Sequence, residues 1–265
     1  MQVSDSDPRE LVRKQFGRNA EHYVSSVAHV KGESLDRMLE LLDPQPEWRA
    51  LDIATGGGHT ALALASRVRE VIATDITPEM LRAAERFVRS RDVANVRFEE
   101  ADAVALPYGD ETFDLITCRI APHHFPDCGR FVQEVARVLR PGGLFGLIDN
   151  VVPDNRSADR FVNSIERLRD PSHRRAYTVS EWKSFFEKAR LEIRALEIFR
   201  KMLHFEQWSG IEGVTAELGE ELWRMMEGAT GAAREALAPE LREGKRSFYL
   251  SEILAVGVRP LSSRS

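Results

Sequence analysis

A glycine-rich turn flanked by two acids is the part of this chain whose residue types and spacing indicate ligand binding. A short apolar segment that contains Asp52 runs into Thr55 and three glycines, of which Gly56 and Gly58 are the outer two, and the next apolar run ends at Asp75. Glycines let the backbone approach a ligand closely, and a helix that begins after them directs its free N–H groups at that ligand. A carboxylate one strand away can accept hydrogen bonds from both hydroxyls of a ribose. The unit therefore predicts a site for a nucleoside-containing cofactor.

The turn by itself fits two kinds of cofactor. Its glycines satisfy the relaxed dinucleotide fingerprint, in which alanine stands at the last position, and Asp75 lies 17 residues after Gly58, close to the expected spacing of about 20. An acid at Asp52 followed by small residues at alternate positions also resembles the first motif of the class I methyltransferases, which use S-adenosylmethionine. Ala54 departs from that family, which most often has glycine at this position. Residues further along the chain have to decide between the two.

Three downstream segments favour the methyltransferase. A strand candidate at residues 96–100 runs into Asp102 and Ala103, where the family has an acid that accepts from the adenine amino group. Residues 106–119 are similar to the family's fourth strand and the turn before it, and residues 138–145 are similar to the end of its next helix and its fifth strand. A dinucleotide dehydrogenase has no reason to carry these segments in this order. The chain is therefore identified as resembling the methyltransferase type 11 group, in its ubiquinone/menaquinone-biosynthesis-like branch.

The resemblance covers roughly residues 45–150 and implies which residues hold the cofactor. In this family the turn offers its backbone to the methionine half, the acid after the second strand binds the ribose, and the next residue packs on the adenine. The cofactor-binding residues implied in this way are Asp52, Ala54, Thr55, Gly56, Gly58, Asp75, Ile76, Met80, Asp102, Ala103, Arg119 and Tyr23. The alternatives are a capping or turn acid for Asp75 and Asp102, and a plain core position for Met80. Tyr23 ends a segment similar to the family's stretch that folds over the cofactor, although an ordinary amphipathic helix has the same pattern.

Two adjacent histidines, His123 and His124, follow the fourth predicted strand in the loop that faces the substrate. An imidazole there can take a proton from a methyl acceptor, because its unperturbed pKa of about 6.5 suits neutral pH. The alternative is that the pair holds the loop through hydrogen bonds. No metal site is expected, because no third ligand is near them in sequence. Arg119, just before this loop, is expected to reach the cofactor carboxylate or a substrate anion, or to form an ordinary ion pair.

Bulk properties describe an ordinary soluble globule. The formal net charge of −5 has no broad basic excess, which disfavours nucleic acid as a partner. The basic cluster at residues 167–175 is either a solvated loop or a receiver for an acidic substrate. The two cysteines are expected to be reduced thiols, the polar first ten residues are no signal peptide, and no apolar run approaches the ~18 residues of a membrane span. A cytoplasmic protein is predicted, with the choice between monomer and homodimer open.

Strand and helix patterns alternate through residue 150, which predicts an α/β, doubly wound and mostly parallel sheet. The resemblance implies seven strands in the order 3-2-1-4-5-7-6 with the last strand antiparallel. Residues 1–44 are predicted as an N-terminal helical lid, and residues 45–265 as a Rossmann-like domain with helical cap insertions at about 155–190 and 205–245.

The function predicted from these features is transfer of a methyl group from S-adenosylmethionine to an O, N or C nucleophile of a small molecule, with release of S-adenosylhomocysteine. An NAD(P)-dependent oxidoreductase is the alternative that the glycine fingerprint alone favours. A catalytically silent S-adenosylmethionine-binding protein is a third possibility, because no residue is an unmistakable catalyst.

Overall fold

The computed structural model describes residues 7–25, 33–210 and 214–261, and the side chains of residues 8 and 18–25 lie outside that description. The strands are β1 (Arg49–Ile53), β2 (Glu70–Asp75), β3 (Val96–Glu100), β4 (Phe113–Arg119), β5 (Leu139–Val152), β6 (Tyr177–Thr178), β7 (Glu192–His204), β8 (Glu240–Arg242) and β9 (Lys245–Val258). The helices are α1 (Pro8–Ser25), α3 (Glu33–Leu42), α4 (His59–Ala65), α5 (Pro78–Arg89), α6 (Cys128–Val138), α7 (Arg156–Arg169), α8 (Val179–Lys188), α9 (Phe205–Gly210), α10 (Ala216–Glu227) and α11 (Gly231–Leu237), with a short 3-10 helix η1 (Pro122–His124).

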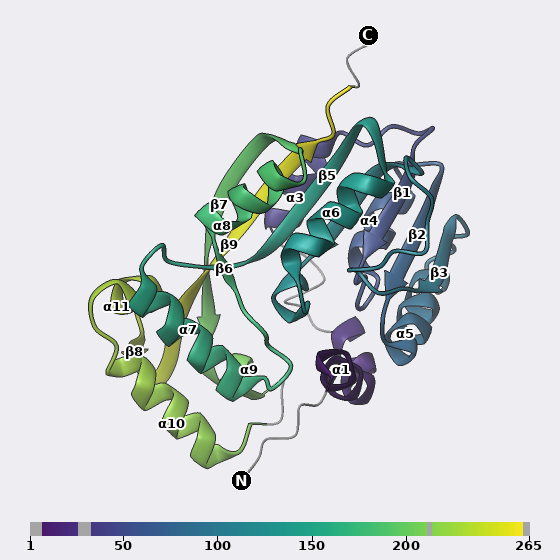
Figure 1. The fold of residues 1–265 in the computed structure, drawn as a ribbon. Coiled ribbons are helices and arrows are strands. Elements are labelled where there is room, and N and C mark those ends of the chain that lie inside the picture. Colours follow the sequence, from purple (N-terminus) through teal and green to yellow (C-terminus); the bar gives the residue numbers. More distant parts are fainter. Residues whose placement is uncertain (1–6, 26–32, 211–213, 262–265) are drawn as a thin grey trace.

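One twisted sheet runs through the molecule in the order β3-β2-β1-β4-β5-β9-β7 (Figure 1). Neighbours from β3 to β5 are parallel, whereas β9 is antiparallel to both β5 and β7. Counted along the chain, β7 is the sixth and β9 the seventh of the strands in this path. The predicted order 3-2-1-4-5-7-6 and the antiparallel last strand are therefore confirmed. Two short strands were not predicted: β6 adds to β5, and β8 adds to β9.

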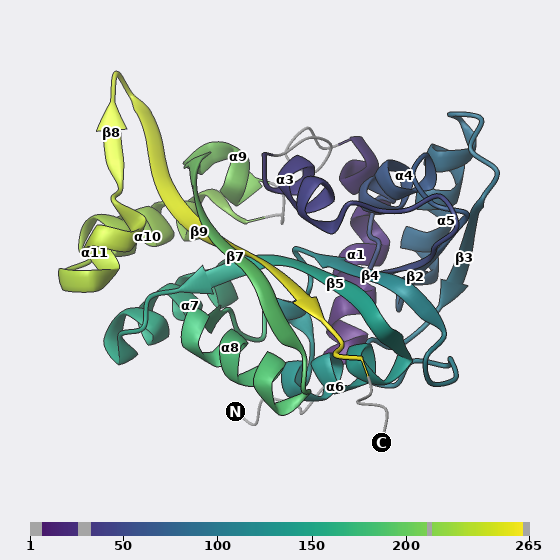
Figure 2. The same ribbon diagram turned by 90° about the horizontal axis from the view of Figure 1, so that it is seen from above.

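Helices cover both faces of the sheet, as a doubly wound fold requires (Figure 2). On one face α6 and α8 bury Phe131, Trp182 and Phe186 in an apolar core. On the other face α3, α4 and α5 pack through a second core that includes Met38 and Leu64. The candidate site described below lies at the carboxyl ends of the parallel strands.

Helix α3 belongs to the core of the molecule. It lies so close to β5 that a Cβ atom on Gly146 would come within 2.8 Å of the Leu42 side chain and 2.9 Å of the Met38 sulfur, so a larger residue would force these side chains to shift. The helix ends at Leu42, because Asp43 adopts φ 42° and Pro44 cannot continue a helix.

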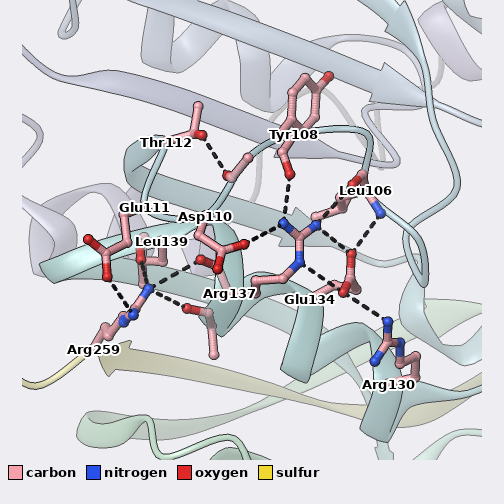
Figure 3. A network of polar contacts seen from close by, with 12 residues as sticks. Leu106, Tyr108, Asp110, Glu111, Thr112, Arg130, Glu134, Arg137, Leu139 and Arg259 are labelled. Atoms are coloured by element: carbon pink, nitrogen blue, oxygen red, sulfur yellow. Dashed lines mark hydrogen bonds and ion pairs between the residues drawn. The ribbon is translucent and has the colours of Figure 1, made fainter.

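An ion pair between Glu134 and Arg137, of which Glu134 is the buried partner, holds the segment that joins β3 to β4 (Figure 3). Glu134 of α6 accepts a hydrogen bond of 2.9 Å from the Leu106 N–H and pairs at 2.8 Å with Arg137 one turn later. Arg137 in turn donates to the carbonyls of Leu106 (3.0 Å) and Tyr108 (2.6 Å). These bonds hold the chain that follows Asp102, which lines the site described below.

Helices α7, α9, α10 and α11 with strand β8 form a group at the far ends of β7 and β9, here called the cap (Figure 1). The cap has its own apolar core, built around Phe205, Trp208, Leu222, Trp223 and Phe248. Helix α8 packs instead on the sheet, through the core that it shares with α6. The division into a lid, a main domain and two cap insertions stays a prediction.

Candidate functional site

A cavity lies at the carboxyl ends of β1, β2 and β4. Strand β1 is the point at which the strand order reverses, since β2 lies on one side of it and β4 on the other. Ligands bind at this crevice in open α/β sheets. The predicted site residues that line the cavity are Asp52, Ala54, Thr55, Gly56, Asp75, Ile76, Met80, Asp102, Ala103, Arg119 and His124.

The backbone of the cavity wall is held in unusual conformations. Gly56 has φ 53°, and two residues with side chains, Ala54 and Ile120, both have φ 52°. A left-handed conformation costs a residue with a Cβ roughly 1–2 kcal/mol, and it is rarest for β-branched residues such as Ile120. Strain of this kind is found at functional sites, where the surrounding structure holds it in place. Ala54 directly follows β1 and Ile120 directly follows β4. Both strained residues line the cavity.

Asp52 holds the turn after β1 through hydrogen bonds. Its carboxylate accepts hydrogen bonds from the hydroxyls of Thr55 (2.6 Å) and Thr117 (2.8 Å). Burial raises the pKa of Asp52 to about 6, and these two hydrogen bonds oppose that rise. The acid therefore connects β1, β4 and the turn after β1.

Asp75 stands at the end of β2 beside the turn. One carboxylate oxygen accepts from the Gly56 N–H at 3.1 Å, and the other accepts from the Thr77 N–H at 2.9 Å. Burial raises the pKa of Asp75, although the backbone hydrogen bonds act in the opposite direction. Each oxygen keeps a lone pair that these contacts do not use, since a carboxylate has about four acceptor sites. The group is thus suited to a second pair of donors, such as a ribose diol.

Asp102 follows β3, the strand beside β2. It accepts from the Val104 N–H at 3.1 Å and from Nε of Arg9 at 2.7 Å. Arg9 belongs to α1, which therefore reaches the cavity, as do Val12 and Phe16 of the same helix. Asp102 thus has a partner 93 residues away in the chain.

Arg119 is a partly buried cation of the cavity wall. Its Nε donates to the Thr60 hydroxyl at 3.2 Å. Burial lowers the pKa of Arg119, and the charges of Asp52 and Glu252 oppose this change. Because a guanidinium stays protonated in proteins, Arg119 remains charged and can meet an anion in the cavity.

The two histidines face the loop after α7. Nδ1 of His123 lies 2.6 Å from an oxygen of the buried Asp149, and the His123 carbonyl accepts from the N–H groups of Arg174 and Arg175. Burial tends to lower the pKa of His123, but the charge of Asp149 and the hydrogen bond to it raise that pKa above its ordinary value. His123 does not line the cavity and links β5, η1 and the loop.

His124 does line the cavity, and its Nδ1 is 3.1 Å from the carbonyl oxygen of Ser172. A carbonyl can only accept, so this contact assigns the proton to Nδ1. Nε2 is 3.9 Å from a carboxylate oxygen of Asp170. Burial, together with the neighbouring His123, lowers the pKa of His124 to about 3. The ring is therefore a neutral imidazole at neutral pH.

Among the residues that the structure describes, no three His, Cys, Asp or Glu side chains are arranged to hold a metal ion. None of the helices in that same part of the chain is long and apolar enough to cross a membrane. Both cysteines are buried free thiols.

Comparison with known proteins decides the family. A family model described as a methyltransferase domain matches residues 51–147. The uncharacterized methyltransferase YcgJ of Bacillus subtilis is 37% identical over 246 residues, which cover 92% of this chain and 97% of that protein. The chain belongs to the class I S-adenosylmethionine-dependent methyltransferases.

Solved structures agree with this methyltransferase family. The crystal structure of YcgJ from B. subtilis has a TM-score of 0.83 at 37% identity and covers 86% of this chain and 99% of that one. A putative methyltransferase from Bacillus halodurans has the same TM-score at 36% identity, with 86% of this chain and all of that one (100%) covered. The demethylmenaquinone methyltransferase of Deinococcus radiodurans is 34% identical over 150 residues, which cover 54% of this chain and 61% of that protein.

The polar groups of this methyltransferase's cavity fit an adenosyl cofactor. Asp75 and Asp102 follow two adjacent strands and line one cavity, with spare acceptor positions for a ribose and for an amino group. The turn at Gly56 presents backbone between β1 and α4, and Arg119 offers a cation for a carboxylate. The sulfonium chemistry would be supplied by the cofactor, and the protein would supply these contacts.

Two predicted residues of the methyltransferase do not line the cavity, and the side chain of a third is not described. Gly58 has φ 82° at the start of α4, where a Cβ would come within 3.1 Å of Ala84, so its role here is close helix packing. His123 lies behind the wall, as described above. Tyr23 is in the backbone of α1, and its side chain is outside the described residues. Sequence reasoning missed Arg9, because nothing in a polar N-terminal helix indicates a partner so far along the chain.

Proposed function

We propose that this methyltransferase binds S-adenosylmethionine in the cavity and transfers its methyl group to an O, N or C nucleophile of a small molecule. The observation that carries the proposal is the pair of acids, Asp75 and Asp102, on the wall of one cavity that the glycine turn also lines. As the bond between nucleophile and methyl carbon forms, the carbon–sulfur bond breaks and its electron pair stays on sulfur, which leaves S-adenosylhomocysteine.

The chain's own residues then hold and align the two reactants. We assign the ribose to Asp75, the adenine amino group to Asp102, the adenine face to Ile76 and Met80, and the methionine carboxylate to Arg119. The backbone at residues 54–56 contacts the methionine half. Alignment of this kind can supply roughly 7–11 kcal/mol of the barrier, so the enzyme needs no covalent step of its own.

The acceptor is proposed to bind on the His124 side of the cavity. Phe16, Phe125 and Pro126 line this side, and the Phe16 ring meets His124 edge to face at 5.0 Å between centroids. Because the pKa of His124 is depressed to about 3, we assign it to orient the acceptor as a neutral imidazole. His123, paired with Asp149, is assigned to hold the loop.

The apolar and aromatic lining favours an acceptor with a flat apolar body. Several relatives are named demethylmenaquinone methyltransferases, and two of them match 54% and 43% of the chain. Quinols and phenols are therefore the first acceptors to try, ahead of amines and carboxylates. The buried reduced cysteines lead us to propose a cytoplasmic location as well.

Calorimetry tests the cofactor and a methyl-transfer assay tests the reaction. We expect S-adenosylmethionine and S-adenosylhomocysteine to bind with one site per chain, and NADPH to show no heat. Tighter binding of NADPH would contradict the proposal. Turnover of radiolabelled methyl donor with a panel of quinols, phenols, amines and carboxylates would identify the acceptor class, and a protein that binds the donor but methylates no member would be a silent binder.

A further inference from the structure

Helix α1 is attached to the rest of the molecule in a different way from the other N-terminal helix. None of its described side chains is fully buried, whereas α3 buries Ser34, Leu35, Met38, Leu39 and Leu42. Among the described side chains of α1, Phe16 packs on Met80 and Ala83 of α5 and meets the His124 ring edge to face. A segment with few buried apolar contacts opens at low free-energy cost compared with the core.

Two arginines on α1 add polar contacts to this attachment. Arg9 donates to Asp102 at 2.7 Å, with side-chain exposures of 39% and 24%. Arg13 donates through Nε to the Ile76 carbonyl at 3.0 Å and through Nη2 to Glu100 at 2.8 Å, and both of these charged side chains are about half exposed. The two arginines are one helical turn apart, so they act from the same face of α1.

Two of these partners, Asp102 and Ile76, are residues that the proposed function assigns to adenine. Asp102 is the proposed acceptor for the adenine amino group, and Ile76 is the proposed contact of the adenine face. Arg9 lines the same cavity as both of them. Asp102 accepts two hydrogen bonds in the structure and has acceptor positions left, so adenine and Arg9 can share the carboxylate.

We propose that Arg9 and Arg13 are positioning residues of the adenine site, and that they strap α1 across it so that the cofactor passes only when both contacts break. Arg9 orients the Asp102 carboxylate toward the cavity, and Arg13 fixes the backbone at Ile76. This inference rests on the proposed function for the identity of the ligand. The strap itself is a property of the protein without ligand.

The consequence is kinetic. If α1 had to move for the cofactor to enter and to leave, loss of one contact would raise the association rate and the dissociation rate together. A residue that only touches bound cofactor would change the dissociation rate and leave association nearly unchanged. Since half-exposed ion pairs are weak and screened by salt, each contact is expected to change the rates about two- to fivefold, and added salt should have the same direction of effect.

The test is surface plasmon resonance on the immobilised full-length chain with S-adenosylhomocysteine as the probe. Arg9→Gln and Arg13→Gln should each raise both rates about two- to fivefold, and the double variant roughly tenfold. Arg9→Lys keeps the charge and should stay closer to the wild type. Arg89→Gln is the matched control, because Arg89 pairs with Glu85 on α5 at similar exposure and away from α1. It should leave both rates unchanged.

Hydrogen exchange on the ligand-free protein gives a readout that does not depend on the cofactor. Amides of α1 should exchange faster in the glutamine variants than in the wild type, while those of α3 keep their protection. Changes in the dissociation rate alone, or α1 exchange equal to that of the wild type, would overturn the strap. Failure of every variant and of the wild type to bind S-adenosylhomocysteine would instead overturn the proposed function, and the exchange result would still decide whether α1 is held by the arginines.

Discussion

Replacing Asp75 by asparagine is the substitution that tests the ribose assignment most directly. Each oxygen of Asp75 accepts one backbone N–H, from Gly56 and from Thr77, and retains a position for one ribose hydroxyl. Asparagine keeps one oxygen as an acceptor and replaces the other by an amide NH2 group. This NH2 group is a donor and faces a backbone N–H group. One hydroxyl then loses its partner and the second loses a charged acceptor. We expect the cost to be about 1–3 kcal/mol, or roughly a 5- to 150-fold rise in Kd.

The assay is titration calorimetry with S-adenosylhomocysteine and with its 2′-deoxy analogue. The wild type should bind the analogue more weakly than the parent compound, because one hydroxyl is missing. Asp75→Asn should show a smaller difference between the two compounds than the wild type does. This four-way comparison separates the contact between carboxylate and hydroxyl from any general disturbance of the turn, which would weaken both ligands by the same factor.

Two results would refute the reasoning about Asp75. Unchanged affinity of Asp75→Asn for the parent compound would mean that the carboxylate does not reach the ribose. An equal penalty for the deoxy analogue in wild type and variant would mean that some other group holds that hydroxyl. Thermal unfolding of the variant should be measured in parallel, so that a loss of folded protein is not counted as a loss of affinity.

Three further predictions concern stability. Ala54→Gly should raise the free energy of unfolding by about 0.5–1 kcal/mol in urea, because it relieves a residue at φ 52° that glycine adopts freely; a destabilised variant would contradict the strain. Glu134→Ala should cost about 1–3 kcal/mol, because the buried Leu106 N–H loses its acceptor, whereas Asp110→Ala, whose side chain is 73% exposed at the same ion-pair network, should stay within about 0.5 kcal/mol. The native pKa of His124 is about 3 and its unfolded pKa is about 6.5, so the unfolded state binds the extra proton between these values and this residue lowers stability as pH falls through that window. The stability advantage of wild type over His124→Gln should therefore shrink between pH 7 and pH 5, and a constant difference would argue against a buried neutral ring.

Local sequence signals predicted the cofactor half of the fold well. The turn after β1 and the alternation of strands and helices depend on residues close together in the chain. Residues 138–145 were expected to hold the end of a helix and the fifth strand, and α6 does end at Val138. Strand β5 begins at once at Leu139, so that Pro141 and the glycines after it lie inside it, where the register with β4 shifts between Phe113 and Leu115. A proline cannot donate to the ladder, and it is tolerated at an irregular place such as this one.

Long-range contacts could not be predicted from the sequence. The contact between Arg9 and Asp102 depends on where α1 docks, and no local pattern contains that information. Strand β7 continues to His204, beyond the predicted end at residue 198, because it pairs with β9 along its whole length. The environment of His124 is set by Ser172 and Asp170, which come from a loop that the sequence showed only as part of a basic cluster.

The hairpin of β7 and β9 has a consequence for how the family can diverge. Strand β9 pairs with β5 only from Ser251 onward, while its pairing with β7 extends back to Ser247, so the two strands continue past the main sheet as a two-stranded arm. Residues 205–244, between the two strands of the arm, supply most of the helices at its tip. Insertions there leave every hydrogen bond around β1, β2 and β4 intact, and the entropic cost of a longer connection grows slowly with its length. The tip can therefore vary between homologues, by exchange of that segment, without any rebuilding of the nucleoside half.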